Sequence, residues 1–407
     1  MEISLALSCL ALALVILNSL TIRVVRNQPK KVSESVSILI PMRNEEKNVA
    51  NCVNSLISQT GLEDFEILVL DDCSTDQTMK ELSRFSDIKL LSGKSLPDGW
   101  LGKLWALEQL VAASDGKYLV FIDADVRLTE HAVASAIKQM RDWDFISAYP
   151  KQITSGFIQR LFQPLLQWSW LASVPLKISE KFSIKSMAVA NGQFFIIKRD
   201  AYLKSGGFEV IKFEVLDDLM MAKQLLKSGF KGGVAEASNV ATCQMYDSPM
   251  QLIKGYQKSL WRAFGSPLGS IMAVVLLFVT GVLPFISTLF GSEIGLISFG
   301  LIFLGRIISS IRTNTPPNTA LLHPIAILFL IGLIAYSWFG KLTKTLTDEN
   351  NRNRRILWHW IRNRQNRFEA KPSGHRAIAL RRGDHCECQF HGYTGKRFAQ
   401  TRFTKSH

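Results

Sequence analysis

Asp123 and Asp125 stand one residue apart, directly after the apolar run Tyr118–Ile122. Two carboxylates with this spacing at the end of a strand can share one divalent cation, and Mg²⁺ or Mn²⁺ then completes its octahedral shell with phosphate oxygens. A cation held there offsets the charge that builds on a departing diphosphate. The pair alone is weak support for this chemistry, because carboxylates at strand ends often only cap the next helix.

The segments that must position these acids alternate between strand and helix over residues 36–240. Four apolar runs predict strands: Val36–Pro41, Glu66–Leu70, Ile88–Leu91 and Tyr118–Ile122. Two stretches predict helices: Glu45–Gln59 and Leu104–Ser114. This alternation indicates an α/β fold with a mostly parallel sheet covered on both faces. Such sheets bind ligands at the carboxyl ends of their strands, where the Asp123/Asp125 pair and a second pair, Asp71-Asp72, would both lie.

Several polar motifs follow one another in a fixed order between residues 36 and 262. They are Pro41-Met42-Arg43-Asn44-Glu45-Glu46, Asp71–Asp76, Leu96–Leu107, Asp123-Ala124-Asp125, Asn191-Gly192-Gln193, Gly206–Glu209 and Asp217-Asp218. This order resembles the family 2 glycosyltransferases, which are inverting enzymes with the GT-A nucleotide-sugar-binding fold. The W-x-G-K element at Trp100–Lys103 is most similar to the bacterial subgroup near ceramide glucosyltransferases. That subgroup includes hopanoid-associated and carotenoid-acid glycosyltransferases.

The resemblance implies a role for each matching residue. It places the nucleotide near Pro41, Arg43 and Glu45, the base and ribose near Asp71 and Asp72, and the metal and diphosphate near Asp123 and Asp125. Asp218 matches the second acid of the family's acidic pair, the general base that takes the proton of the acceptor hydroxyl. Asp217 stands where the family usually has Glu, so the choice between these two acids stays open. Both acids could instead cap the helix predicted at Leu219–Lys227.

Other residues are candidates for contact with the substrates. Lys103 could bind donor phosphate or be a solvated helix residue, and Trp100 could contact the acceptor. Family members often carry Q-x-x-R-W near the end of the domain, where this chain reads Gln257-Lys258-Ser259-Leu260-Trp261. Leu260 at the Arg position weakens the case for a processive synthase and suits a single transfer to a lipid. Gln257 and Trp261 could still shape the acceptor site, although a packing role for Trp261 fits equally well.

Hydropathy predicts that membrane helices flank this domain. Hydrophobic residues make up 47% of the chain, and they concentrate in the four stretches Ile3–Leu20, Ile271–Phe290, Ile294–Ile311 and Ala320–Phe339. Each stretch approaches the roughly 20 residues needed to cross a bilayer. The chain thus divides into an N-terminal membrane anchor at 1–22, a catalytic domain at 36–262, three transmembrane helices at 271–339 and a basic tail at 341–407, predicted to be disordered.

The charge distribution predicts an orientation in the membrane. The tail holds 16 Lys/Arg and five Asp/Glu residues, so most of the net charge of +14 lies there and the rest of the chain does not indicate a nucleic-acid partner. The first stretch lacks a basic region before it, unlike a cleaved signal peptide, and basic residues from Arg23 onward favour a multi-pass protein of the inner (cell) membrane with a cytoplasmic catalytic domain. Four spans then place the basic tail outside, against the positive-inside tendency. Either one stretch is re-entrant, Phe157–Lys177 also crosses, or the tail is unusual; Phe157–Lys177 could equally be interfacial or a core helix.

These observations together predict a membrane-bound inverting glycosyltransferase that moves one sugar from a nucleotide-sugar donor to a lipid acceptor. The resemblance points to UDP-glucose as the donor and to Mg²⁺ or Mn²⁺ as the cofactor. A processive polysaccharide synthase and a nucleotidyltransferase would share much of this pattern. A non-catalytic membrane scaffold is the alternative from another class of protein.

Overall fold

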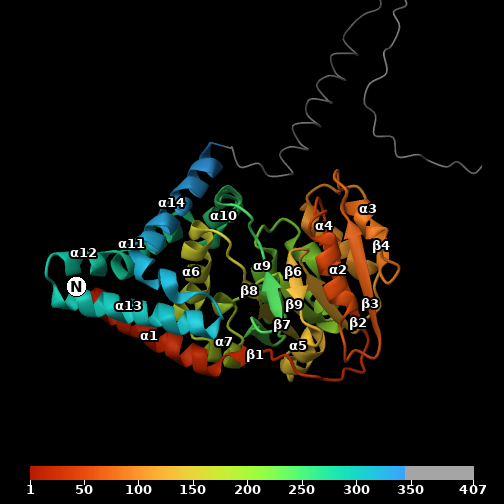
Figure 1. Cartoon of the computed structure of the whole chain (residues 1–407), viewed down its shortest axis with the longest axis horizontal. Coiled ribbons are helices and arrows are strands. Elements are labelled where there is room, and N and C mark those ends of the chain that lie inside the picture. Colours follow the sequence, from red (N-terminus) through yellow and green to blue (C-terminus); the bar gives the residue numbers. More distant parts are fainter. Residues whose placement is uncertain (344–407) are drawn as a thin grey trace, which may run out of the picture. The chain divides into compact units, whose positions relative to one another are not determined.

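The structure is a computed structural model that describes residues 1–343, so the predicted tail lies almost entirely outside the described residues (Figure 1). Eight strands of this part form one sheet in the order β1-β10-β7-β9-β5-β2-β3-β4. In that order they span Arg23–Val24, Gly232–Glu236, Phe145–Tyr149, Phe194–Lys198, Tyr118–Ile122, Val36–Met42, Phe65–Asp71 and Lys89–Ser92. Among these eight, β9 alone runs antiparallel to its neighbours. The predicted mostly parallel sheet is therefore confirmed.

Side chains of the central strands alternate between the two faces of this sheet. In β2, Ile38 and Ile40 belong to one buried apolar cluster and Leu39 belongs to the other. The first cluster is covered by α2 (Val49–Ile57), α3 (Thr78–Leu82) and α5 (Ala132–Met140). The second is covered by α4 (Gly102–Ala112), α8 (Arg199–Ser205) and α9 (Asp217–Lys227). The strands are apolar on both sides because helices cover both faces, as in other sheets of this class.

A second, smaller sheet lies beside the Asp123/Asp125 turn. It consists of β6 (Val126–Leu128), β11 (Ala241–Cys243) and β8 (Lys151–Gln152). The register pairs Cys243 with Val126, the residue after Asp125. Segments more than a hundred residues apart in the sequence thus meet at the metal-binding motif predicted from the sequence.

The first helix of the sheet domain begins later than the sequence predicted, because a loop follows β2. The apolar stripe predicted a helix from Glu45, whereas α2 begins at Val49. Asn44 has a φ of +56°, a left-handed conformation that does not continue a helix. The backbone N–H of Asn44 donates to Ser74 Oγ at 2.9 Å and that of Glu45 donates to Thr78 Oγ1 at 2.8 Å. These bonds tie the loop after β2 to the loop after β3.

Four helical segments are long and apolar enough to cross a membrane: Glu2–Thr21, Pro267–Leu289, Glu293–Arg312 and Pro317–Leu342. They comprise α1 (Glu2–Thr21), α11 (Pro267–Gly281), α12 (Leu283–Leu289), α13 (Glu293–Arg312), η3 (Pro317–Leu322) and α14 (His323–Leu342). One segment precedes the sheet domain and three follow it, as predicted. The α1 helix packs along α13, and its Ser4 hydroxyl donates to the carbonyl of Val279 at 2.9 Å.

The predicted segment Phe157–Lys177 forms α6 (Phe157–Ser173), which leads into α7 (Leu176–Phe182). The α6 helix packs against α1, α13 and α14, and its apolar side chains join the cluster of those helices. Asn18 of α1 fixes the end of α6, because its Nδ2 donates to the carbonyls of Leu171 at 2.8 Å and Val174 at 2.7 Å. The interpretation of this segment as a core helix of the sheet domain is therefore wrong. The remaining helices of the described residues are the short η1 (Lys185–Met187) and η2 (Phe208–Ile211) and the longer α10 (Pro249–Ala263).

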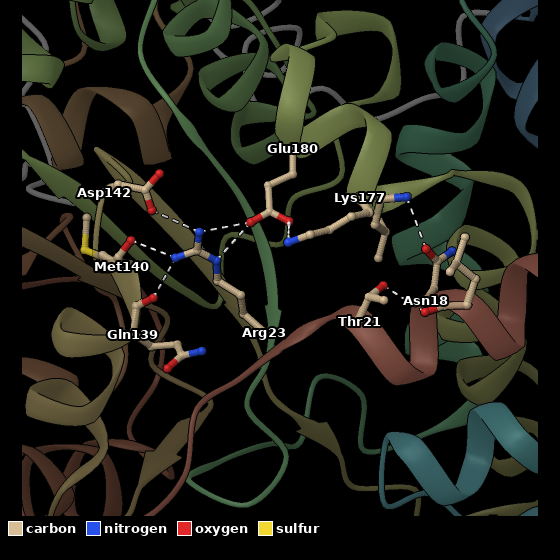
Figure 2. Close-up of polar contacts among 10 residues, drawn as sticks. Asn18, Thr21, Arg23, Gln139, Met140, Asp142, Lys177 and Glu180 are labelled. Atoms are coloured by element: carbon tan, nitrogen blue, oxygen red, sulfur yellow. Dashed lines mark hydrogen bonds and ion pairs between the residues drawn. The ribbon is translucent and has the colours of Figure 1, made fainter.

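Arg23, the first residue of β1, joins the end of α1 to the sheet domain (Figure 2). Its guanidinium donates to the carbonyls of Gln139 at 3.0 Å and Met140 at 2.9 Å. It also forms ion pairs with Asp142 at 3.1 Å and Glu180 at 3.0 Å. One side chain thus connects α5, the loop that follows it and α7.

Arg23→Met is expected to lower the free energy of unfolding by about 2–3 kcal/mol, because the half-buried Glu180 carboxylate and two carbonyls lose a charged donor. Thermal melting of the full chain in detergent micelles measures the change. Arg26→Met is the matched control, since Arg26 is exposed and has no ion pair among residues 1–343. Equal melting temperatures for the two variants would contradict this role of Arg23.

Candidate active site

Acids from three segments gather at the candidate site: Asp72 after β3, Asp123 after β5 and Asp217 at the start of α9. Lys103 forms ion pairs with the last two. Its Nζ lies 2.8 Å from Asp123 Oδ1, at the end of β5, and 3.6 Å from Asp217 Oδ2, at the start of α9. Lys103 is near the start of α4, which packs beside β2. Burial lowers the pKa of Lys103, but the charges of Asp123 and Asp217 raise it by more, so the net pKa is above its ordinary value. Lys103 is therefore a cation shared by two sets of acids.

A cavity of about 340 Å³ opens beside this lysine. Its lining includes these candidates for donor or metal binding: Pro41, Arg43, Glu45, Asp72, Lys103, Asp123 and Asp125. Arg43 Nη1 lies 3.5 Å from Asp72 Oδ2, and both residues line the cavity. Asp71 is deeper and only 5% exposed; its Oδ2 accepts the N–H of Ser74 at 3.2 Å, and its Oδ1 has no hydrogen-bond partner within the described residues.

The second acid of the motif, Asp125, is largely buried. Its Oδ1 has no hydrogen-bond partner in the part of the chain that the structure describes. Burial, and then the negative charge of Asp123, raise the pKa of Asp125 from 3.8 to about 6; a hydrogen bond from the Cys243 thiol opposes this shift. A buried carboxylate oxygen without a hydrogen-bond partner suits an oxygen-seeking cation.

Arg127 holds the backbone of the Asp123-Ala124-Asp125 turn. Its Nη1 donates to the carbonyls of Ala124 at 2.7 Å and Val126 at 2.8 Å. Its Nη2 donates to Asn48 Oδ1 at 2.6 Å, and Asn48 Nδ2 donates to Glu45 Oε2 at 2.7 Å. Burial raises the pKa of Glu45, and the Asn48 hydrogen bond partly opposes the shift. The sequence analysis missed both Arg127 and Asn48, because nothing in the local pattern marks a side chain that binds carbonyls.

Asp218 accepts two backbone N–H groups. Its Oδ2 accepts from Gly192 at 2.9 Å and its Oδ1 accepts from Leu219 at 2.7 Å. Burial, and then the charge of Asp217, raise the pKa of Asp218 from 3.8 to about 7. A Cβ added at Gly192 would lie 3.3 Å from the Asp218 Cβ, so a side chain at this position would crowd the carboxylate. The helix-capping alternative for Asp218 therefore describes only one of its two bonds.

The Asn191-Gly192-Gln193 loop that presents this N–H is itself fixed on both sides. The Asn191 N–H donates to Ser147 Oγ at 2.7 Å, and the Ser147 hydroxyl donates back to the Asn191 carbonyl at 3.0 Å. The buried Gln193 side chain accepts a hydrogen bond from Gln152 Nε2 at 2.8 Å. The loop links β7 to the end of β5, since the Asp123 N–H donates to the carbonyl of Gln193.

The three residues predicted to contact an acceptor lie apart from this cluster of acids. Trp100 is 5% exposed in the apolar cluster beneath α4, with its ring centroid 5.3 Å from that of Trp105. Gln257 and Trp261 lie against α14, where the Ser337 hydroxyl donates to the Gln257 carbonyl and accepts the Trp261 N–H at 2.9 Å. Packing therefore accounts for the observed positions of these three residues.

Residues 37–206 match the family model described as Glycosyl transferase family 2. This part of the chain is similar to family 2 glycosyltransferase domains. The matched part begins in β2, ends after α8, and contains Asp71, Asp72, Asp123 and Asp125. The pair Asp217-Asp218 and the α10 helix lie beyond it.

Two curated relatives carry the name 4,4'-diaponeurosporenoate glycosyltransferase. The one from Staphylococcus aureus (strain bovine RF122 / ET3-1) is 26% identical over 254 residues, which are 61% of this chain and 66% of that protein. The one from Staphylococcus haemolyticus (strain JCSC1435) is 24% identical over 265 residues, 62% of this chain and 68% of that protein. The chain thus spans about two thirds of the length of the curated relatives it matches.

A solved structure of a mannosyltransferase from Pyrobaculum calidifontis, in complex with GDP-Man and Mn²⁺, superimposes with a TM-score of 0.49 at 17% identity. The superposition covers 85% of this chain and 99% of that one.

Proposed function

We propose that the protein is a membrane-bound inverting glycosyltransferase that moves one sugar, glucose, from a UDP-sugar to an apolar lipid acceptor on the cytoplasmic side of the inner membrane. The observation that carries the proposal is the position of Lys103 between the Asp123/Asp125 turn and the Asp217-Asp218 pair. It joins a candidate phosphate site to a candidate base. The four apolar helices support the membrane location.

The donor would occupy the 340 Å³ cavity. Asp72 at the cavity wall and the buried Asp71 next to it would receive the base and ribose. Arg43 and Glu45 would line the nucleotide pocket beside Pro41, and Lys103 would bind the phosphates. Asp71 supports this assignment, because its unpartnered Oδ1 can accept a hydrogen bond from a nucleoside.

A divalent cation fits the Asp123/Asp125 turn only together with the donor. Among residues 1–343 no three His, Cys, Asp or Glu groups gather at one point, so two carboxylates would hold the ion and the donor phosphates would complete its shell. The open Oδ1 of Asp125 fits that role. When bound, Mg²⁺ or Mn²⁺ offsets the charge on the leaving diphosphate.

Asp218 is the proposed general base. A carboxylate with a pKa raised to about 7 can both lose its own proton at neutral pH and take one from an acceptor hydroxyl. Asp217 is less suited as the base, because its ion pair with Lys103 stabilises the ionised carboxylate and so makes it a weaker proton acceptor. The two N–H bonds to Asp218 would orient its carboxylate toward the acceptor hydroxyl. As Asp218 takes the hydroxyl proton, the acceptor oxygen would attack the anomeric carbon on the face opposite the diphosphate, and the configuration at that carbon would invert.

The names of the relatives support an apolar acceptor. Those proteins are named for a carotenoid acid, and we propose for this chain an acceptor of the same general class, an extended apolar molecule with a terminal hydroxyl or carboxyl group. The packing of α6 and α10 against the apolar helices supports delivery from the bilayer.

Membranes that contain the full chain test the proposal when they are incubated with UDP-glucose, Mn²⁺ and a bacterial lipid extract. We expect UDP to be released together with lipids that carry one hexose, detected by mass spectrometry. Release of pyrophosphate would show a nucleotidyltransferase, and products with many sugars would show a processive synthase. Membranes with the double variant Asp217→Asn/Asp218→Asn are the control; equal turnover in them would contradict the proposed site.

A further inference from the structure

Asp125 lies between two cavities. One is the 340 Å³ cavity assigned above to the donor, and the other, about 860 Å³ in volume, extends from the loop after β2 to the α10 helix. Asn44, Glu45 and Asp125 line both cavities. A group bound in the larger cavity could therefore approach the same carboxylate as the donor.

The α10 helix turns two lysines toward the larger cavity. Lys254 and Lys258 are four residues apart, one helical turn, and both line it. On the other side of α10, Leu252 and Leu260 are buried in the apolar cluster formed with α6 and α14. Bonds from Ser337 of α14 to α10 hold this orientation. The lysines cannot turn away from the cavity without exposure of the apolar side.

Three of the acids that line this cavity, Glu46, Asp76 and Asp247, already accept hydrogen bonds. Glu46 Oε2 accepts from the Gln77 N–H at 3.1 Å, and Asp247 Oδ1 accepts from Gln244 Nε2 at 2.8 Å. Asp76 Oδ1 likewise accepts the N–H and hydroxyl of Thr78. In contrast, neither Lys254 nor Lys258 has an ion pair or hydrogen bond with any residue in 1–343. These two ammonium groups are therefore available for an anion.

We propose that Lys254 and Lys258 form an anion subsite that binds a phosphate or carboxylate group of a substrate beside Asp125. The proposal rests on the proposed function, because the anion is a part of the donor or of the acceptor. In the first case the subsite binds the diphosphate and neutralises it from α10 as the sugar leaves. In the second case the subsite binds the acid group of an apolar acceptor, beside the region where α10 packs against the end of α14.

Binding to the full chain in detergent micelles tests the subsite without turnover. The double variant Lys254→Gln/Lys258→Gln removes both charges, and Lys254→Arg/Lys258→Arg keeps them. Lys227→Gln is the matched control, because Lys227 is an exposed helical lysine that lines neither cavity. The probes are UDP with Mn²⁺, uridine, palmitic acid and its uncharged counterpart hexadecanol.

A diphosphate subsite predicts that the Gln double variant weakens UDP binding by about tenfold or more while uridine binding stays the same. An acceptor-acid subsite predicts the same loss for palmitic acid, with UDP and hexadecanol unchanged. In either case the Arg double variant restores most of the binding. Dissociation constants within about twofold of wild type for both UDP and palmitic acid would overturn the subsite. Failure of the wild-type chain to bind any nucleotide would instead count against the proposed function, while palmitic acid still reports on the lysines.

Discussion

Asp125→Asn is expected to reduce sugar transfer by about 100-fold or more, because an amide is a poor ligand for the cation that would stabilise the leaving diphosphate. The same change is expected to leave the folded protein at least as stable as wild type. The pKa of Asp125 is raised to about 6 mainly by burial, so above this pH the charged carboxylate opposes folding and Asn removes the opposition. Below the usual pKa of 3.8 the carboxyl group is neutral in both states, and the gain in stability should vanish.

Thermal melting near pH 8 and near pH 3 measures the stability change, and UDP release at saturating Mn²⁺ measures transfer. Asp115→Asn is the matched control, since Asp115 is exposed and lines none of the cavities described here. Turnover of Asp125→Asn equal to wild type at saturating Mn²⁺ would remove Asp125 from the metal site. A lower melting temperature at the higher pH would show that its carboxylate has a structural partner.

Asp218→Asn is expected to reduce transfer to a hydroxyl acceptor by about 100- to 10,000-fold, the range for loss of a general base. Donor binding should stay close to wild type, because Asp218 lies beyond the nucleotide cavity. For the wild-type protein, kcat/KM with a hydroxyl acceptor should fall as the pH drops below about 7, since only the deprotonated carboxylate can take a proton. A carboxylic-acid acceptor is already ionised at this pH and needs no base, so its profile should stay flat there.

Asp217→Asn separates the two acids. This variant keeps the Asp218 carboxylate and loses the contact with Lys103, so we expect a smaller decrease in transfer and a retained dependence on pH. A larger loss in Asp217→Asn than in Asp218→Asn, measured with the same hydroxyl acceptor, would reverse the assignment of the base.

The central strands and the apolar helices were predicted correctly from the sequence, because each has a clear local pattern of apolar residues. The strands β2, β3 and β5 are short apolar runs that are followed directly by the polar residues Arg43, Asp72 and Asp123. The four apolar segments are long and apolar enough to cross a membrane. The predicted start of α2 was wrong, because the prediction relied on the spacing of apolar residues alone. Side-chain bonds from Ser74 and Thr78, which spacing does not reveal, decide the conformation of residues 44 and 45.

The candidate site was predictable residue by residue but not as an arrangement. Acidic pairs at strand ends were visible, whereas the bridge from Lys103 to Asp123 and Asp217 depends on how α4 and α9 pack. Trp100 was ambiguous because a tryptophan in a core and one at an acceptor site look alike in a sequence. The sequence did not predict a role for Lys254 and Lys258, because exposed lysines are common on helices. Only the structure shows that both line a cavity.

The attachment of the sheet domain to the apolar helices limits how this protein can be produced as a fragment. A soluble fragment cut at residues 36–262 would lose Arg23, and with it a strand of the sheet and the donor that serves Asp142 and Glu180. It would also uncover the side chains of Leu161, Phe162, Leu165 and Trp168, which are buried against the neighbouring helices. An apolar surface of that kind promotes aggregation in water. Purification in detergent or lipid, with α1 retained, therefore suits this protein better than expression of the isolated sheet domain.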